Sequence, residues 1–186
     1  RLGANPAVMA YPVGAENTFQ GVVLLLERKA LIWQGDETGA KFVEEEVPTE
    51  MKEVVEKWRT KLIEQISETD DALLNKFLAG EEPSINELKV ALRKAVIAYK
   101  LVPMYAGASL RNKGVQPLLD AVVEYLPSPV DVDHVKGINP KTGAEEVRKT
   151  INEEKFCGLT FKIQTDPHVG RITYVRIYSG TLKSGQ

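Results

Sequence analysis

The stretch that most constrains the fold is an apolar run, a turn of small residues and an amphipathic helix, in that order. Residues 101–105 predict a short strand, residues 106–109 predict the turn, and residues 114–126 predict the helix. Two prolines follow and prevent the helix from continuing, because proline lacks an amide hydrogen and disfavours helix in the preceding residue. The apolar positions of the helix recur every 3.6 residues; they are Val115, Leu118, Leu119, Val122, Val123 and Leu126.

A strand, a tight turn and a helix at this spacing form one βα unit of an α/β sheet. Ligands bind such sheets at the carboxyl ends of the strands. The turn that follows residue 105 is therefore the first candidate ligand site, and its residues are Gly107, Ala108, Ser109 and Leu110.

The segment before this unit begins with strand-like runs. Residues 7–13 predict one strand, and residues 19–26 are continuously apolar, as expected for a strand that is covered on both faces. Residues 30–33 and 41–47 flank a polar tip, residues 34–40, that contains two glycines. This pattern predicts a hairpin with a longer loop.

A helical block begins near Pro48, since proline is favoured in the first turn of a helix. One apolar stripe at helical spacing is expected in the core; it contains Met51, Val54, Val55, Trp58, Leu62 and Ile66. Glu64, Glu68 and Asp71 recur at i, i+4 and i+7, so on a continuous helix they share one outward face. Such a face is either simply solvated or a docking surface for a basic partner.

Two further helices are expected before the βα unit. Residues 72–78 predict a short one, and Ser84 with Glu87 forms a capping box that starts the next. Its apolar face is expected to contain Leu88, Ala91, Leu92, Ala95, Val96 and Tyr99. Three basic residues project elsewhere and are interpreted as solubility residues without a ligand: Lys89, Arg93 and Lys94.

The character of the chain changes after the βα unit. Residues 131–155 are polar and broken by glycine and proline, which predicts a linker or an edge hairpin. From residue 156 onward apolar and polar residues alternate, and residues 165–171 supply a turn between two strands. Two strands do not make a stable domain, so they are expected to begin a larger unit.

The composition excludes several classes of function. The net charge of −2 gives no overall basic field for nucleic acid, and no apolar run approaches the length of a membrane span. The one cysteine, Cys157, excludes an internal disulfide and is expected to be an inert buried thiol in a reducing compartment. The two histidines, His134 and His168, show no metal-ligand spacing.

Residues 107–129 resemble the last strand, turn and helix of the GTPase domain of bacterial-type translation elongation factor G. Residues 1–6, 12–23 and 161–185 resemble the same family and follow the family's order. The resemblance covers nearly the whole chain and implies a middle piece of a longer protein. A chain that starts without methionine fits this expectation.

The resemblance implies an α/β fold followed by the first strands of a β-barrel. Residues 1–100 would form an α+β insert of a P-loop GTPase-type domain, and residues 101–130 its last βα unit. Residues 131–155 would be a linker or edge hairpin, and residues 156–186 the start of domain two. The parent would be a cytoplasmic GTPase that uses GTP and Mg²⁺ to drive movement of tRNA and mRNA through the ribosome.

The sequence lacks the phosphate-binding half of such a site. No G-x-x-x-x-G-K-[ST] loop and no Asn-Lys-x-Asp occurs. Asn112 and Lys113 imitate the last motif, but Val115 stands where its carboxylate should be. By family order the missing elements precede Arg1. We therefore expect this piece alone to bind no GTP or GDP and to be inactive.

Gly107 to Leu110 match the fifth motif of the family, which places backbone amides near the guanine O6. The usual order of its central pair is serine then alanine, whereas here Ala108 precedes Ser109. Backbone amides do not depend on the side chain, so we expect this contact to survive. The sequence leaves open whether this chain makes the hydrogen bond that the usual serine hydroxyl forms.

The resemblance also implies partners. The helix with Glu64, Glu68 and Asp71 matches the one that contacts the ribosomal stalk protein, and contacts with ribosomal RNA and tRNA would lie in absent parts of the parent. No membrane partner is expected. Two alternatives are a ribosome-protection or release-type GTPase, and a stand-alone interaction module without a nucleotide role. A phosphate-binding loop upstream in the same reading frame would eliminate the second.

Overall fold

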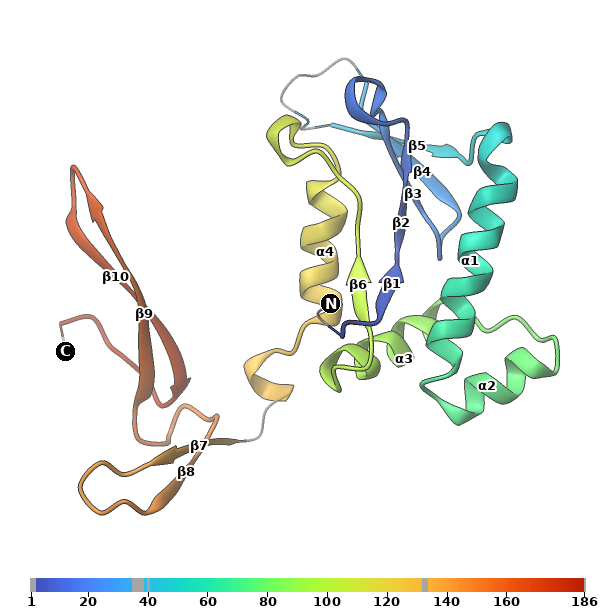
Figure 1. Cartoon of the computed structure of the whole chain (residues 1–186). Coiled ribbons are helices and arrows are strands. Elements are labelled where there is room, and N and C mark those ends of the chain that lie inside the picture. The colour runs from blue at the N-terminus through green and yellow to red at the C-terminus, as the bar shows by residue number, and fades with distance from the viewer. Residues whose placement is uncertain (1–2, 35–38, 40, 132–133, 186) are drawn as a thin grey trace. The chain divides into compact units, whose positions relative to one another are not determined.

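A computed structural model describes residues 3–34, 39, 41–131 and 134–185. The chain divides into two compact units, Arg1–Leu126 and Pro127–Gln186, and each is described by itself. Unit 1 holds the hydrophobic core, and Figure 1 shows its strands next to helices. No helix in the described part of the chain is long and apolar enough to cross a membrane.

An antiparallel sheet forms the first layer of unit 1. Its strands lie in the order β2 (Ala10–Val13), β3 (Gly21–Leu24), β4 (Lys29–Ile32) and β5 (Val43–Glu46). Val22 and Val23 of β3 are buried, so the expectation of a covered strand in residues 19–26 is confirmed. β4 and β5 form the predicted hairpin, and residues 35–38 and 40 of its tip lie outside the described residues.

The expectation of one strand over residues 7–13 is wrong, because the chain changes sheet at Met9. β1 (Pro6–Val8) pairs in parallel with β6 (Val102–Met104), whereas β2 joins the antiparallel sheet. The Met9 amide donates to the Met104 carbonyl at 2.9 Å, and the Met9 carbonyl accepts from the Leu25 amide at 3.0 Å. One residue is thus bonded to both sheets, and Figure 1 shows β1 and β6 side by side.

Helices pack on these strands. After a short 3₁₀ turn, η2 (Thr49–Met51), the chain forms α1 (Lys52–Ser67), α2 (Asp71–Leu78) and α3 (Ile85–Ile97). The predicted α1 stripe is confirmed at Val55, Leu62 and Ile66, which are buried in the core. Most of the predicted α3 face is also buried, namely Leu88, Ala91, Leu92, Ala95 and Val96. Tyr99 is an exception, since it lies beyond the helix end and is exposed.

The last helix of unit 1, α4 (Val115–Tyr125), lies within one residue of the predicted bounds at each end. Its buried residues are Pro117, Ala121 and Tyr125. Most of the apolar stripe identified in the sequence is exposed, namely Leu118, Leu119, Val122, Val123 and Leu126. α4 packs against α3 through its small and tyrosine side chains, and the described residues leave its larger aliphatic side chains uncovered.

Unit 2 consists of two hairpins and a short 3₁₀ turn, η4 (Pro129–Asp131), within the described residues. β7 (His134–Ile138) pairs with β8 (Glu145–Lys149), so residues 131–155 contain the edge hairpin rather than a plain linker. β9 (Cys157–Asp166) pairs with β10 (Gly170–Ser179) around the predicted turn. The Asp166 carboxylate accepts from the amides of His168 and Val169 and closes that turn. Cys157 is half-buried.

Candidate functional site

The turn after β6 presents its backbone at the surface. Ser109–Arg111 form a 3₁₀ turn, η3, and Leu110 is 99% exposed. The Ala108 amide donates to the Lys113 carbonyl at 2.8 Å, and the Lys113 amide donates back at 3.1 Å. These two bonds close the loop, while the amides of Ser109 and Leu110 donate no hydrogen bond within the described residues. Two adjacent donors are therefore free for a ligand.

Glycines at the base of the turn allow two backbone segments to approach closely. Gly114 has a φ of +79°, and a Cβ there would lie 2.9 Å from the Ala106 oxygen and 3.0 Å from the Gly107 Cα. A Cβ on Gly107 would lie 3.0 Å from the Lys113 oxygen. The chain crosses itself here without room for side chains. The sequence pattern placed a glycine-containing turn at this position but did not indicate this crossing.

The loop between β4 and β5 supports the same turn, a contact for which the sequence contains little sign. The Gly39 carbonyl accepts from Trp33 Nε1 at 3.1 Å and from Gln116 Nε2 at 3.0 Å. A Cβ on Gly39 would lie 2.4 Å from the Arg111 oxygen, so the two loops are in direct backbone contact. In the sequence, the signal was only a pair of glycines in a polar tip.

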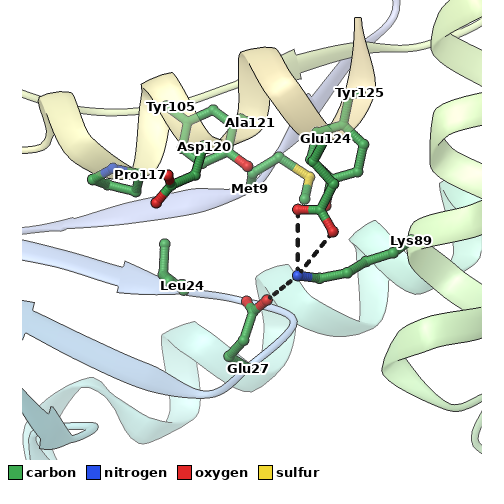
Figure 2. Close-up of a pocket in the computed structure, with 10 residues that line it drawn as sticks. All are labelled: Met9, Leu24, Glu27, Lys89, Tyr105, Pro117, Asp120, Ala121, Glu124 and Tyr125. Atoms are coloured by element: carbon green, nitrogen blue, oxygen red, sulfur yellow. Dashed lines mark hydrogen bonds and ion pairs between the residues drawn. The ribbon is translucent and has the colours of Figure 1, made fainter.

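An ion cluster joins the helix of the βα unit to the rest of unit 1 (Figure 2). Lys89 of α3 lies 3.0 Å from Glu27 Oε1 and 3.1 Å from Glu124 Oε1, beside a cavity of about 130 Å³. Arg93 also donates to the Glu124 carbonyl at 2.6 Å. The interpretation of Lys89 and Arg93 as solubility residues is wrong, because both bind groups of α4 that sequence spacing alone does not bring near them.

Burial affects the titration of the groups around this cavity. Burial lowers the pKa of Lys89, but hydrogen bonds and charge attraction from Glu27 and Glu124 outweigh it, so the net pKa is raised. Burial, with nearby carboxylates, raises the pKa of Tyr105 and Tyr125 far above the ordinary tyrosine value. Both phenols are therefore protonated at neutral pH. The cluster is suited to holding α4 in place.

The three candidate partner-binding carboxylates are all exposed, but they do not lie on one helix as expected. α1 ends at Ser67, Glu68 is its C-cap, and Asp71 is the first residue of α2. The break has a local cause: the Asp70 side chain accepts from the amide of Ala72 at 3.0 Å and starts a new helix. Helical spacing therefore relates Glu64 to Glu68 only.

The described residues contain few side chains suited to binding a metal or to thiol chemistry. Among the described residues, no group of three or more histidine, cysteine, aspartate or glutamate side chains is arranged to hold a metal ion. The candidate site is thus defined by backbone donors rather than by titrating side chains.

Comparison with known proteins adds two matches. Residues 155–186, which include β9 and β10, match the family model of elongation factor G domain 2. The family match supports a translation elongation factor fragment. A crystal structure of a protein from Thermus thermophilus is 31% identical, with a TM-score of 0.71 over 97% of this chain. The chain spans 24% of the length of that protein, and the candidate turn lies outside the segment that the family model matches.

Proposed function

We propose that this chain is a piece of bacterial-type translation elongation factor G that contains the guanine-side turn of its GTPase domain. One observation carries the proposal. A βα unit whose turn has free backbone donors at Ser109 and Leu110 is followed in the same chain by a segment matching elongation factor G domain 2. The parent would couple GTP hydrolysis to movement of tRNA and mRNA through the ribosome.

The residues present fit one edge of the nucleotide. The free amides of Ser109 and Leu110 are suited to donate to an oxygen such as the guanine O6, and both residues are exposed. No residue pattern in the chain fits the phosphates or Mg²⁺, because no phosphate-binding loop is encoded. When bound, GTP would supply the phosphoryl group and Mg²⁺ would neutralise its charge, on residues of the parent outside this chain.

Deleting one amide tests the guanine contact in the full-length parent. Ser109→Pro removes the amide hydrogen at a 3₁₀ position that tolerates the φ of proline. Loss of one hydrogen bond is expected to weaken GDP binding roughly tenfold. Ser109→Ala keeps the amide and is the matched control, with unchanged affinity. Equal affinity of both variants and the wild type, measured by calorimetry, would show that the turn does not face the base.

The chain 1–186 alone is expected to show negligible affinity for GDP with Mg²⁺. Two backbone donors do not offset the cost of ordering a ligand whose phosphates find no partner. Isothermal titration checks this expectation, and binding at micromolar concentration or tighter would contradict it. The same measurement on the parent supplies the positive control.

We also propose that the insert binds a basic partner, the ribosomal stalk protein, through Glu64, Glu68 and Asp71. The support is their exposure and shared charge. Reversing all three charges in the parent is expected to slow ribosome-stimulated GTP turnover and leave nucleotide binding unchanged. Glu64→Lys with Glu68→Lys should have a larger effect than Asp71→Lys, because only the first two are one helical turn apart. Unchanged turnover would assign these residues to solvation alone.

A further inference from the structure

A second cavity in unit 1 is lined by two arginines, three glutamates and an apolar wall. It holds about 230 Å³ and lies between the β3–β4 turn, α1 and the loop that joins α2 to α3. It shares no lining residue with the cavity beside Lys89. Its lining includes Arg28, Arg59, Glu82, Ile63, Phe77 and Pro83. None of these residues belongs to the candidate nucleotide turn or to the three acidic residues described above.

Arg59 is the unusual member of this cavity. It projects from the middle of α1, and the residue is only 5% exposed. Its Nη2 pairs with Glu82, but its buried Nε has no hydrogen-bond partner within the described residues. A buried guanidinium with an unused donor is costly unless an acceptor is bound. The Nε donor of Arg59 is therefore available to a further acceptor.

Arg28 provides the second positive charge. It lies in the β3–β4 turn with a φ of +54°, a conformation that non-glycine residues rarely adopt. Its Nε and Nη2 bind the two oxygens of Glu56 at 2.8 and 3.2 Å, which leaves Nη1 directed at Glu82. The turn thus holds one edge of the Arg28 guanidinium near Arg59.

Glu82 is a poor occupant of the space between the two arginines. A single oxygen, Oε1, lies 2.6 Å from Arg59 Nη2 and 3.5 Å from Arg28 Nη1. Guanidinium groups bind carboxylates best when two parallel hydrogen bonds form, whereas the Oε1 atom of Glu82 is shared between two guanidinium groups. The Glu82 side chain is 54% exposed and follows Gly80, which has a φ of +77° in the α2–α3 loop. Because Glu82 is half-exposed and lies on a loop, a carboxylate that forms two parallel hydrogen bonds with the guanidinium can displace it.

We propose that this cavity binds the carboxylate of an acidic side chain from a partner protein, with Glu82 as the internal competitor. The incoming carboxylate bonds to Arg59 and to the free edge of Arg28, and Glu82 moves into solvent. Ile63 and Pro83 are buried and Phe77 is partly buried, so they offer an apolar surface to the methylene groups of the incoming side chain. The proposal does not depend on the proposed function, because none of its residues contacts the nucleotide turn.

Titration of the chain 1–186 with butanoate, which mimics a glutamate side chain, tests the site. The side-chain Nε–H signals of ¹⁵N-labelled protein report binding, and sodium chloride at equal ionic strength serves as the solvent control. Glu82→Gln should bind roughly fivefold more tightly than the wild type, because the competing carboxylate is gone. Glu53→Gln removes the same charge from an exposed position of α1 that does not line the cavity; it should behave like the wild type.

A further variant and two further ligands decide the nature of the bound group. Adding Arg28→Met to Glu82→Gln should abolish most of the gain, and acetate should bind more weakly than butanoate because it lacks the apolar stem. No saturable change in Glu82→Gln would overturn the site and leave water as the acceptor of Arg59 Nε. An equal response with and without Arg28 would also overturn it. Tighter binding of inorganic phosphate than of butanoate would overturn the assignment to a protein carboxylate.

Discussion

Helices α3 and α4 have the same type of sequence pattern but opposite burial. Each carries an apolar stripe at helical spacing, and in each the bounds agree with the sequence. Leu92 of α3 is fully buried, whereas Leu119 of α4 is 58% exposed. The comparison shows that the periodic spacing of apolar residues predicts an amphipathic helix but does not determine which face of the helix its neighbours cover.

The two helices also start differently. α3 begins with a side-chain cap, since Ser84 Oγ accepts from the Glu87 amide and Glu87 Oε2 accepts from the Ser84 amide. α4 begins at Gly114, which has no side-chain cap and a left-handed backbone. Local residues therefore specify α3, whereas α4 is placed by the backbone crossing at Gly114 and by contacts from α3.

The uncovered face of α4 has a counterpart in the strand before it. Val102 and Met104 of β6 are also about half exposed, although parallel strands normally lie in sheets that are covered on both faces. Under the proposed function, the preceding part of a GTPase-type domain would cover these surfaces. In the chain 1–186, they contribute little to stability.

The largest expected difference between the helices follows from identical truncations. Leu92→Ala should lower the free energy of unfolding of the chain 1–186 by about 2–5 kcal/mol, because it opens a cavity in the core. Leu119→Ala should change it by less than about 0.5 kcal/mol, since the side chain is exposed and alanine favours helix. Urea unfolding measures both. Equal losses would mean that the face of α4 is covered in solution.

The start of α4 is expected to tolerate no side chain at residue 114. Gly114→Ala should destabilise unit 1 by roughly 2 kcal/mol or more, because it combines a left-handed backbone with close contacts to residues 106 and 107. Gly80→Ala is the matched control, with a φ of +77° but no atom within 4 Å of the new Cβ. It should cost only about 1 kcal/mol. If thermal unfolding shows similar losses of stability for Gly114→Ala and Gly80→Ala, then the backbone crossing relaxes easily.

The link between the helices can be tested at Lys89. Lys89→Met leaves Glu27 and Glu124 facing each other without a cation and should cost about 1–2 kcal/mol, a value reduced by partial exposure. Lys94→Met removes the same charge from an exposed position of α3 and should cost less than about 0.5 kcal/mol. Hydrogen exchange should also become faster in α4 of the first variant only. Unchanged exchange would show that the cluster does not hold α4.

The comparison also shows how far the sequence can predict this fold. Local signals placed the βα unit, the capping box at Ser84, the β4–β5 hairpin and the β9–β10 hairpin close to their observed bounds. The strand change at Met9 and the salt bridges of Lys89 depend on residues far away in the chain, so no local pattern indicates them. The helix break at Asp70 has a local cause, but the helical spacing of Glu64, Glu68 and Asp71 predicted one continuous helix.

The same distinction applies to the candidate site. A turn of small residues at the end of a strand is a recognisable pattern, and Ser109 and Leu110 lie in a turn after β6 as that pattern predicts. The support for this turn comes from Gly39, which lies 77 residues before its partner Gln116 in the chain, and only the folded structure reveals it. Backbone geometry is predictable over short spans, whereas the packing that stabilises it is not.

The smallest expected effect concerns pH at the start of α3. Hydrogen bonds from Lys76 and then from Ser84 lower the pKa of Glu87 from 4.5 to about 2. Because the folded pKa is depressed, its stabilising contribution is fully present above about pH 4.5 and is lost as pH falls toward 2. Glu87→Gln should therefore flatten the pH dependence of urea unfolding in this window, whereas Glu53→Gln, which removes a charge from α1, should not. If Glu87→Gln keeps the wild-type slope, then Glu87 does not hold its hydrogen bonds with Lys76 and Ser84 in solution.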